Sequence, residues 1–298
     1  IGNVRKFILQ WNHKKRRTHY FLNGKSRRIH YDKKNFLGLS YSAGNGPLAQ
    51  VKMASKAGYD YVSLRTIPMG QAGEPQVHLE NNPGLFASIQ VALEETSLQP
   101  LDIELVRVKE DLPRDYRGAF ECAAKLGFTD VLSSVWTMDH GFAVDCYGKI
   151  CEDAKEFGLT MNLEFPVISG LVNLPDTLQF LKEVGADNAK VLLDMLYCYW
   201  SGVTVEDLKK LDPSLVGVIH LCDCPKNEKA YKPVESCGKH GEYVGRGAIP
   251  VKDYLKVLPE GPCSIELPNK KYIETYGEEG HIRNCLETAR EYLTAAGL

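Results

Sequence analysis

The stretch from Thr160 to Leu221 decides the fold, because it contains three short apolar runs that each carry a polar side chain at or near their end. These runs are TMNLEF (160–165), KVLLD (190–194) and LVGVIHL (215–221), and longer segments lie between them. Continuous apolar runs are typical of strands that are covered on both faces, as in a parallel sheet. The stretch therefore predicts buried parallel strands that are joined by helices.

The same alternation continues on both sides of this stretch. The predicted strands are Phe36–Tyr41, Tyr61–Leu64, Leu101–Val106, Asp130–Val135, Thr160–Phe165, Lys190–Asp194, Leu215–Leu221 and Pro262–Leu267. The predicted helices are Leu48–Ala57, Pro83–Glu95, Tyr116–Leu126, Val144–Phe157, Pro175–Val184, Val205–Leu211, Val251–Leu258 and Gly280–Ala296. Eight such βα units in about 260 residues predict an α/β fold, a (β/α)8 TIM barrel with a parallel sheet. An open doubly wound sheet is the alternative, but the first turn, SAGNGP (42–47), lacks the glycine spacing of a dinucleotide site.

Charge is unevenly distributed along the 298 residues, although the net charge is only −2. Residues 1–34 contain eleven Lys or Arg and one acid, which leaves 25 basic and 37 acidic residues in 35–298. We therefore divide the chain into a basic N-terminal extension, a tag or an arm, at 1–34 and a single catalytic barrel at 35–298. A basic arm on an acidic body is also found in nucleic-acid binders. A solvated tail is the simpler interpretation, so nucleic acid is not the expected partner.

Apolar and cysteine patterns indicate a cytoplasmic protein without a membrane partner. No apolar run approaches the roughly 20 residues that span a bilayer, and no signal peptide is recognisable at the N-terminus. Nine cysteines are scattered without a disulfide framework, as expected in a reducing compartment. Cys222 and Cys224 form a C-x-C pair that lacks a second pair at zinc spacing, so we interpret them as buried thiols.

Four successive predicted strands carry metal-binding side chains at equivalent positions near their ends. These side chains are Glu164, Asp194, His220 and Glu266. Each alone could cap a helix or be hydrogen-bonded in the core, but in a barrel the ends of all the strands meet at one face. Three carboxylates and one imidazole suit one hard divalent ion, Mn²⁺ first, with Mg²⁺ or Co²⁺ as alternatives. The spacing therefore predicts a single metal site.

The segments NLEF, LLDM, IHLCD and SIELP, which carry these four residues, resemble the xylose isomerase-like barrel superfamily of sugar phosphate isomerases and epimerases. This group includes ketose 3-epimerases, hydroxypyruvate isomerase, ketoinositol dehydratase and endonuclease IV. The resemblance runs from about Asn35 to the C-terminus. It implies that Glu164 and Glu266 are catalytic and transfer the substrate proton, while Asp194 and His220 are metal ligands only. Endonuclease IV is disfavoured, since its three-metal site needs more histidines.

Two positions depart from the epimerase pattern. Tyr197 stands where the epimerases have His, and Lys226 stands where they have Arg. Both family residues hold the ketose, so the resemblance does not extend to ketose 3-epimerisation itself.

Six residues are candidates for substrate binding, in addition to the metal ligands. They are Arg65, Trp136, Tyr197, Lys226, His240 and Arg246. Arg65 could hold a carboxylate or phosphate, Trp136 could stack on a sugar, and His240 and Arg246 lie in a glycine-rich loop that could close over the substrate. Asp223 is expected to support a metal ligand from behind.

These observations predict a metal-dependent isomerase or epimerase of a sugar or keto-polyol, an enzyme of carbohydrate metabolism that could form a homo-oligomer. The expected reaction removes a proton next to a carbonyl group through an enediolate. The close alternative is a lyase or dehydratase that expels a β-hydroxyl or an aglycone from the same enediolate, with Tyr197, Lys226 or His240 as the acid. A third hypothesis is a metal-binding barrel without turnover.

Overall fold

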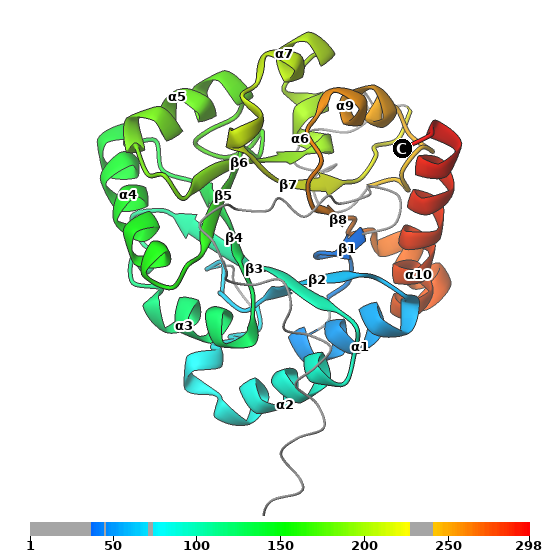
Figure 1. The fold of residues 1–298 in the computed structure, drawn as a ribbon, viewed down its shortest axis with the longest axis horizontal. Coiled ribbons are helices and arrows are strands. Elements are labelled where there is room, and N and C mark those ends of the chain that lie inside the picture. The colour runs from blue at the N-terminus through cyan, green and yellow to red at the C-terminus, as the bar shows by residue number, and fades with distance from the viewer. Residues whose placement is uncertain (1–36, 45, 71–73, 227–240) are drawn as a thin grey trace, which may run out of the picture. The chain divides into compact units, whose positions relative to one another are not determined.

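Eight parallel strands close into a barrel, and the helices form a ring around it (Figure 1). The computed structural model describes residues 37–44, 46–70, 74–226 and 241–298. The strands are β1 (Leu37–Leu39), β2 (Tyr61–Arg65), β3 (Gln99–Val108), β4 (Asp130–Val135), β5 (Thr160–Glu164), β6 (Ala189–Asp194), β7 (Val216–Leu221) and β8 (Cys263–Ile265). β8 pairs with both β7 and β1, which closes the ring. The predicted (β/α)8 barrel is confirmed.

The helices that join the strands lie close to their predicted ranges. They are α1 (Pro47–Ala57), α2 (Pro83–Glu94), α3 (Arg117–Leu126), α4 (His140–Glu156), α5 (Leu174–Val184), α6 (Met195–Trp200), α7 (Val205–Lys210), α9 (Val251–Val257) and α10 (Lys270–Ala296), with two 3-10 turns, η1 (Leu79–Asn81) and η2 (Pro213–Leu215). Asparagine side chains begin α2 and α5, where Asn82 and Asn173 each accept a hydrogen bond from a backbone N–H of the first turn. Gly127 and Gly185 end α3 and α5 in the left-handed conformation, which glycine adopts without steric cost.

Two helical boundaries and one whole helix differ from the sequence prediction. α4 begins at His140 instead of Val144, because the Asp139 side chain accepts a hydrogen bond from the Phe142 N–H. α6 was not predicted at all. α10 begins at Lys270 instead of Gly280, and Gly277 interrupts it with a φ of 69°. In each case a local side-chain cap or a glycine sets the boundary. The prediction was based on apolar periodicity, which does not reveal caps or interrupting glycines.

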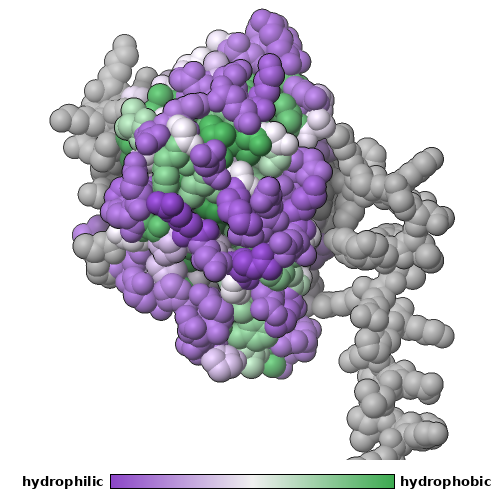
Figure 2. Space-filling model, turned by 90° about the vertical axis from the view of Figure 1, so that its left-hand side faces the viewer, coloured by the Kyte–Doolittle hydropathy of each residue, from purple (hydrophilic) through white to green (hydrophobic). Residues whose placement is uncertain are grey.

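The core has two layers. A large cluster fills the space between the strands and the ring of helices. A small cluster inside the barrel contains Tyr61, Leu101, Leu105, Leu132, Leu192 and Val218. The flank that carries α4 is largely hydrophilic where it meets solvent (Figure 2). Among the described residues, no helix is both long and apolar enough to cross a bilayer.

Strand register brings polar side chains to the same height at the C-terminal end of the barrel. Asp194 on β6 is paired with His220 on β7, and His220 is paired with Ser264 on β8. Glu266 follows β8 two residues after Ser264, so it points to the same side of the sheet as Ser264. On the other flank, Ser134 on β4 is paired with Glu164, the last residue of β5. Side chains from four neighbouring strands therefore converge above the apolar interior.

Candidate metal centre

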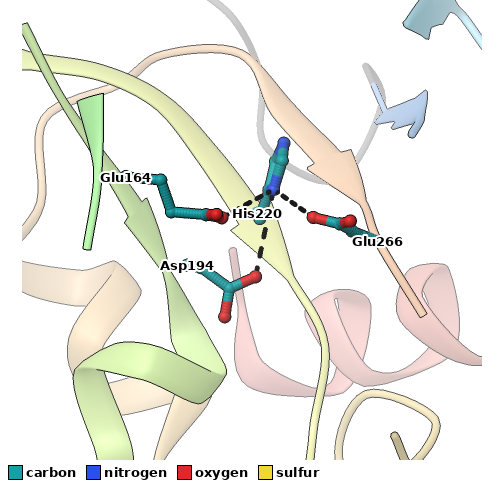
Figure 3. Close-up of side chains that lie close together, drawn as sticks. All are labelled: Glu164, Asp194, His220 and Glu266. Atoms are coloured by element: carbon teal, nitrogen blue, oxygen red, sulfur yellow. Dashed lines mark ion pairs between the residues drawn. The ribbon is translucent and has the colours of Figure 1, made fainter. Parts of the chain in front are cut away.

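The four predicted ligands lie together at the C-terminal end of the barrel (Figure 3). Each offers one donor atom, and these atoms all lie within 4.8 Å of one another. His220 Nδ1 is 2.8 Å from Glu266 Oε2, 3.6 Å from Glu164 Oε1 and 3.9 Å from Asp194 Oδ2. The imidazole thus faces three carboxylates.

The unsatisfied atoms of this cluster fit a bound cation. His220 Nδ1 and Glu164 Oε1 are buried and lack a hydrogen-bond partner. Although His220 Nδ1 is close to Glu266, the ring does not have the alignment of a hydrogen bond. Buried polar groups are normally paired, so such atoms call for an explanation. Three carboxylate oxygens and one nitrogen around a common point are suitable ligands for a hard divalent ion.

The pKa values of the three acids in the cluster are shifted in different directions. Burial, together with Glu266 and Asp194, raises the pKa of Glu164 to about 8, and burial raises that of Asp194 to about 6. Burial also acts to raise the pKa of Glu266, but His220 and Arg65 outweigh it and lower the value. Without a cation, the cluster therefore keeps Glu266 ionised and Glu164 protonated near neutral pH. A bound cation would favour the ionised form of each carboxyl group and so counteract these raised pKa values.

Asp194 also caps the helix α6, which explains why this unpredicted helix forms. Its Oδ1 atom accepts hydrogen bonds from the Leu196 and Tyr197 N–H groups, at 2.7 and 3.1 Å, and so caps α6. Oδ2 is the atom that faces His220. The carboxylate therefore joins the helix to the metal centre and fixes the position of Tyr197.

A cavity of about 350 Å³ opens above the cluster. Its wall includes three of the six predicted substrate-binding residues, Arg65, Trp136 and Tyr197, beside Glu164, Asp194 and Glu266. Trp136 Nε1 donates to Ser134 Oγ at 2.8 Å, which holds the indole at the wall. The structure thus brings half of the predicted set to the same cavity as the metal ligands.

The other three candidates are not placed at the cavity. Lys226 is exposed and does not line it. Arg246 is exposed, its guanidinium lies 5.3 Å from the centre of the Tyr243 ring, and it does not line the cavity. His240 lies outside the described residues.

Asp223 has a role other than the support of a metal ligand that we expected from the sequence. Its carboxylate accepts hydrogen bonds from the backbone N–H groups of Cys224, Gly245, Gly247 and Ile249, at 2.9–3.0 Å. It therefore fastens the loop between β7 and α9 to the end of β7. Its neighbours Cys222 and Cys224 are buried, in agreement with their interpretation.

Arg65 is bound by carboxylates of the protein. Its Nη2 atom lies 3.0 Å from Glu104 Oε2 and 3.9 Å from Glu266 Oε1, and its guanidinium covers the Tyr41 ring at 3.8 Å. The Ser40 hydroxyl donates to Glu104 Oε1 at 2.5 Å. Arg65 is thus positioned to orient Glu266, and its role in substrate binding stays a prediction.

Sequence reasoning missed Glu104 and Arg107, both on β3. The register between β3 and β4 shifts between Ile103 and Val106, so simple alternation along the strand does not show which side chains point inward. A useful signal was available, because charged residues inside an otherwise apolar strand are rarely buried without a partner. Glu104 is indeed fully buried beside Arg65.

Comparisons with known proteins agree with this architecture. The profile of the xylose isomerase-like TIM barrel family matches residues 51–292. An inosose isomerase from Halalkalibacterium halodurans is 22% identical over 267 residues, which cover 82% of this chain and 90% of the relative. A crystal structure of IolI protein with a bound zinc atom superposes with a TM-score of 0.71 at 18% identity, covering 87% of this chain and 98% of the other.

A second solved structure is D-allulose 3-epimerase from Methylomonas sp. in complex with D-allulose. It superposes with a TM-score of 0.62 at 16% identity and covers 90% of this chain and 99% of the other. At these identities the solved structures show the fold alone, whereas the family profile spans most of the chain. The chain belongs to the xylose isomerase-like TIM barrel family.

Proposed function

We propose that this protein is a divalent-metal-dependent isomerase or epimerase that acts on a sugar or a related polyhydroxy carbonyl compound. The observation that carries the proposal is the convergence of Glu164, Asp194, His220 and Glu266 within 4.8 Å at the floor of a cavity. The names of similar proteins point the same way, since they include an inosose isomerase and a D-allulose 3-epimerase. Mn²⁺ is the ion we expect, with Mg²⁺ or Co²⁺ as alternatives, and the zinc atom in the IolI structure is a further candidate.

When bound, such an ion supplies a Lewis acid that makes the hydrogen next to a substrate carbonyl more acidic. Glu266 is ionised and is held by Arg65, so it is the base that removes this proton. Glu164 comes from β5, three strands away around the barrel, and we assign it as the group that returns a proton, through the carboxylate oxygen that a bound ion would leave free. A base and an acid on opposite sides of one carbon atom invert its configuration; a single carboxyl that returns the proton to the neighbouring carbon gives an isomer.

A lyase remains the second candidate function, and Tyr197 is the observation that favours it. Elimination from the same enediolate needs a proton donor near the leaving oxygen, and a phenol can donate one. Of the three acids considered for this step, Tyr197 is the one that lines the cavity. Lys226 is exposed outside the lining, and His240 lies outside the described residues.

The test incubates the Mn²⁺-loaded protein with a panel of keto-sugars in D₂O and follows the products by NMR. Deuterium at a carbon next to the carbonyl group of a rearranged sugar supports the proposal, and loss of water or an aglycone supports the lyase. Glu266→Gln should reduce exchange by at least about 100-fold, since general-base catalysis contributes about 10²–10⁴-fold. Glu279→Gln alters an exposed glutamate paired with Lys56 and serves as the matched control. Undiminished exchange in Glu266→Gln would refute the assignment of the base.

A further inference from the structure

A second arginine lines the cavity beside the metal centre. Arg107 lies near the end of β3, and its guanidinium covers the Trp136 ring at 4.2 Å from the ring centre. Stacking uses the flat face of the guanidinium and leaves its N–H edge available for hydrogen bonds. The Trp136 ring is itself fixed by its hydrogen bond to Ser134. Arg107 is therefore held in a defined orientation at the cavity wall.

Arg107 lacks the counter-ions that Arg65 has. In the described parts of the chain, no carboxylate oxygen lies within 4.0 Å of an Arg107 nitrogen, whereas Arg65 reaches both Glu104 and Glu266. Its Nε atom is buried without a partner, and Nη1 donates to Met69 O at 3.5 Å, near the limit for a hydrogen bond. Burial and the nearby Arg65 lower the pKa of Arg107. An anion beside Arg107 would offset both the cost of burying its charge and the repulsion by Arg65.

The charges that line the cavity favour an anionic ligand at this wall. A divalent ion bound by Glu164, Asp194 and Glu266 leaves a net charge of about −1, and Glu104 neutralises Arg65. Among the described lining residues, Arg107 is then the positive charge that remains for a ligand. With Arg107 the site sums to about zero, but its negative charge lies at the ion, and Arg107 has no carboxylate oxygen within 4.0 Å among the described residues. The carboxylate of an acidic sugar would pair directly with it.

The distance from Arg107 to the metal centre suits a small molecule. Arg107 is paired with Ser134 across β3 and β4, and Ser134 is paired with Glu164 across β4 and β5. Because neighbouring strands lie about 4.8 Å apart, the Cα atoms of Arg107 and Glu164 are separated by about 10 Å. After allowance for the two side chains, a carbonyl group at the centre and an anionic group at Arg107 are only a few carbon atoms apart. The cavity volume of about 350 Å³ is suitable for a molecule of this size.

We propose that the substrate is a keto-sugar acid whose carboxylate is bound by Arg107. This inference rests on the proposed function and narrows its substrate class from keto-sugars in general to those with a carboxylate. One guanidinium edge matches the two oxygens of a carboxylate. A phosphate carries more oxygens and is usually bound by several donors, such as a row of backbone N–H groups. A single unpaired arginine therefore favours the carboxylate.

The test compares three six-carbon ligands by isothermal titration of the Mn²⁺-loaded protein: D-fructuronate, D-fructose and D-fructose 6-phosphate. We expect the wild type to bind D-fructuronate about 10- to 100-fold more tightly than D-fructose, as for a charge-assisted hydrogen-bonded pair. Arg107→Gln should abolish this preference. Arg107→Lys should keep part of it, because the charge remains and the two-pronged edge is lost.

Arg114→Gln is the matched control, because Arg114 also covers an aromatic ring, that of Phe142 at 4.7 Å, but does not line the cavity. It should leave the preference intact. Melting temperature and Mn²⁺ affinity establish whether each variant is folded. If Arg107→Gln does not fold, the comparison of Arg107→Lys with the wild type provides the test.

Three results would overturn the inference: equal binding of D-fructose and D-fructuronate by the wild type, an equal loss for both ligands in Arg107→Gln, or tighter binding of the phosphate than of the uronate. Failure of the proposed function is a separate result, since it would appear as absence of deuterium exchange in every compound, including acids that bind through Arg107.

Discussion

Binding of Mn²⁺ should release protons from the four-residue cluster and should strengthen as the pH rises. Metal ligands must be deprotonated, so the cation competes with protons for the same atoms. The pKa values of Glu164 and Asp194 are raised to about 8 and about 6. Burial acts to lower the pKa of His220, but Glu164 and Glu266 outweigh it and raise the value well above 6.5. At neutral pH both Glu164 and His220 therefore hold a proton that the metal displaces.

The number of protons follows from these values. At pH 7 a carboxyl with a pKa of about 8 holds about 0.9 proton, and one with a pKa of about 6 holds about 0.1 proton. His220 adds up to about one proton, so between about one and two protons should leave for each ion bound. The apparent Mn²⁺ affinity should then rise by about 10- to 100-fold per pH unit near neutrality.

The same pKa shifts predict whether the metal-free protein becomes more or less stable as the pH rises. The folded-state pKa values of Glu164 and Asp194 lie above the unfolded values of about 4.3 and 3.9. Their contribution to stability is fully present below the unfolded values and is lost as the pH rises through about 6 and then about 8. The raised pKa of His220 acts in the same direction, from about pH 6.5 upward. The metal-free protein should thus become less stable with rising pH, and Mn²⁺ should reverse this trend.

Isothermal titration in two buffers with different ionisation enthalpies counts the released protons, and calorimetric melting follows stability with and without Mn²⁺. Glu164→Gln should remove about 0.9 proton from the release at pH 7. Asp130→Asn alters a half-buried carboxyl outside the cluster, bonded to Asn162, and should leave the release unchanged. A release close to zero at pH 7, or an affinity that does not change with pH, would refute the reasoning.

Three further predictions concern the scaffold. Asp223→Ala should lower the free energy of unfolding in urea by about 3 kcal/mol, because four backbone N–H groups lose a charged acceptor. Hydrogen exchange at 245–249 should accelerate, and unchanged exchange would contradict this role. Gly217→Ala should cost about 1–3 kcal/mol, because a Cβ would overlap the Asn162 side chain; a cost below about 0.5 kcal/mol would show that Asn162 can move. A chain that begins at Asn35 should keep its melting temperature and Mn²⁺ affinity, while any salt-dependent nucleic-acid binding should disappear. Loss of folding would show that residues 1–34 belong to the barrel domain.

Local sequence was sufficient to predict the barrel and the convergence of four side chains that could bind a metal ion. Apolar runs are short-range signals, and eight repetitions of them leave few alternative folds. Glu164, Asp194, His220 and Glu266 could be predicted because the ends of parallel strands meet at one face whatever the details of packing. The helix boundaries were less predictable, since side chains such as Asp139 and Asn269 set them through single hydrogen bonds.

The sequence by itself thus determined the strand order and which four side chains converge on one point. Only the tertiary structure decided which charges are paired. Arg65 and Arg107 both lie near the end of a strand, yet Arg65 is bound by Glu104 and Glu266, while no carboxylate oxygen among the described residues lies within 4.0 Å of an Arg107 nitrogen. Asp223 likewise binds backbone N–H groups that lie more than twenty residues away. The physical reason is that charge pairing depends on distances of a few ångströms. These distances are set by strand register and by bulges, and local sequence does not encode them.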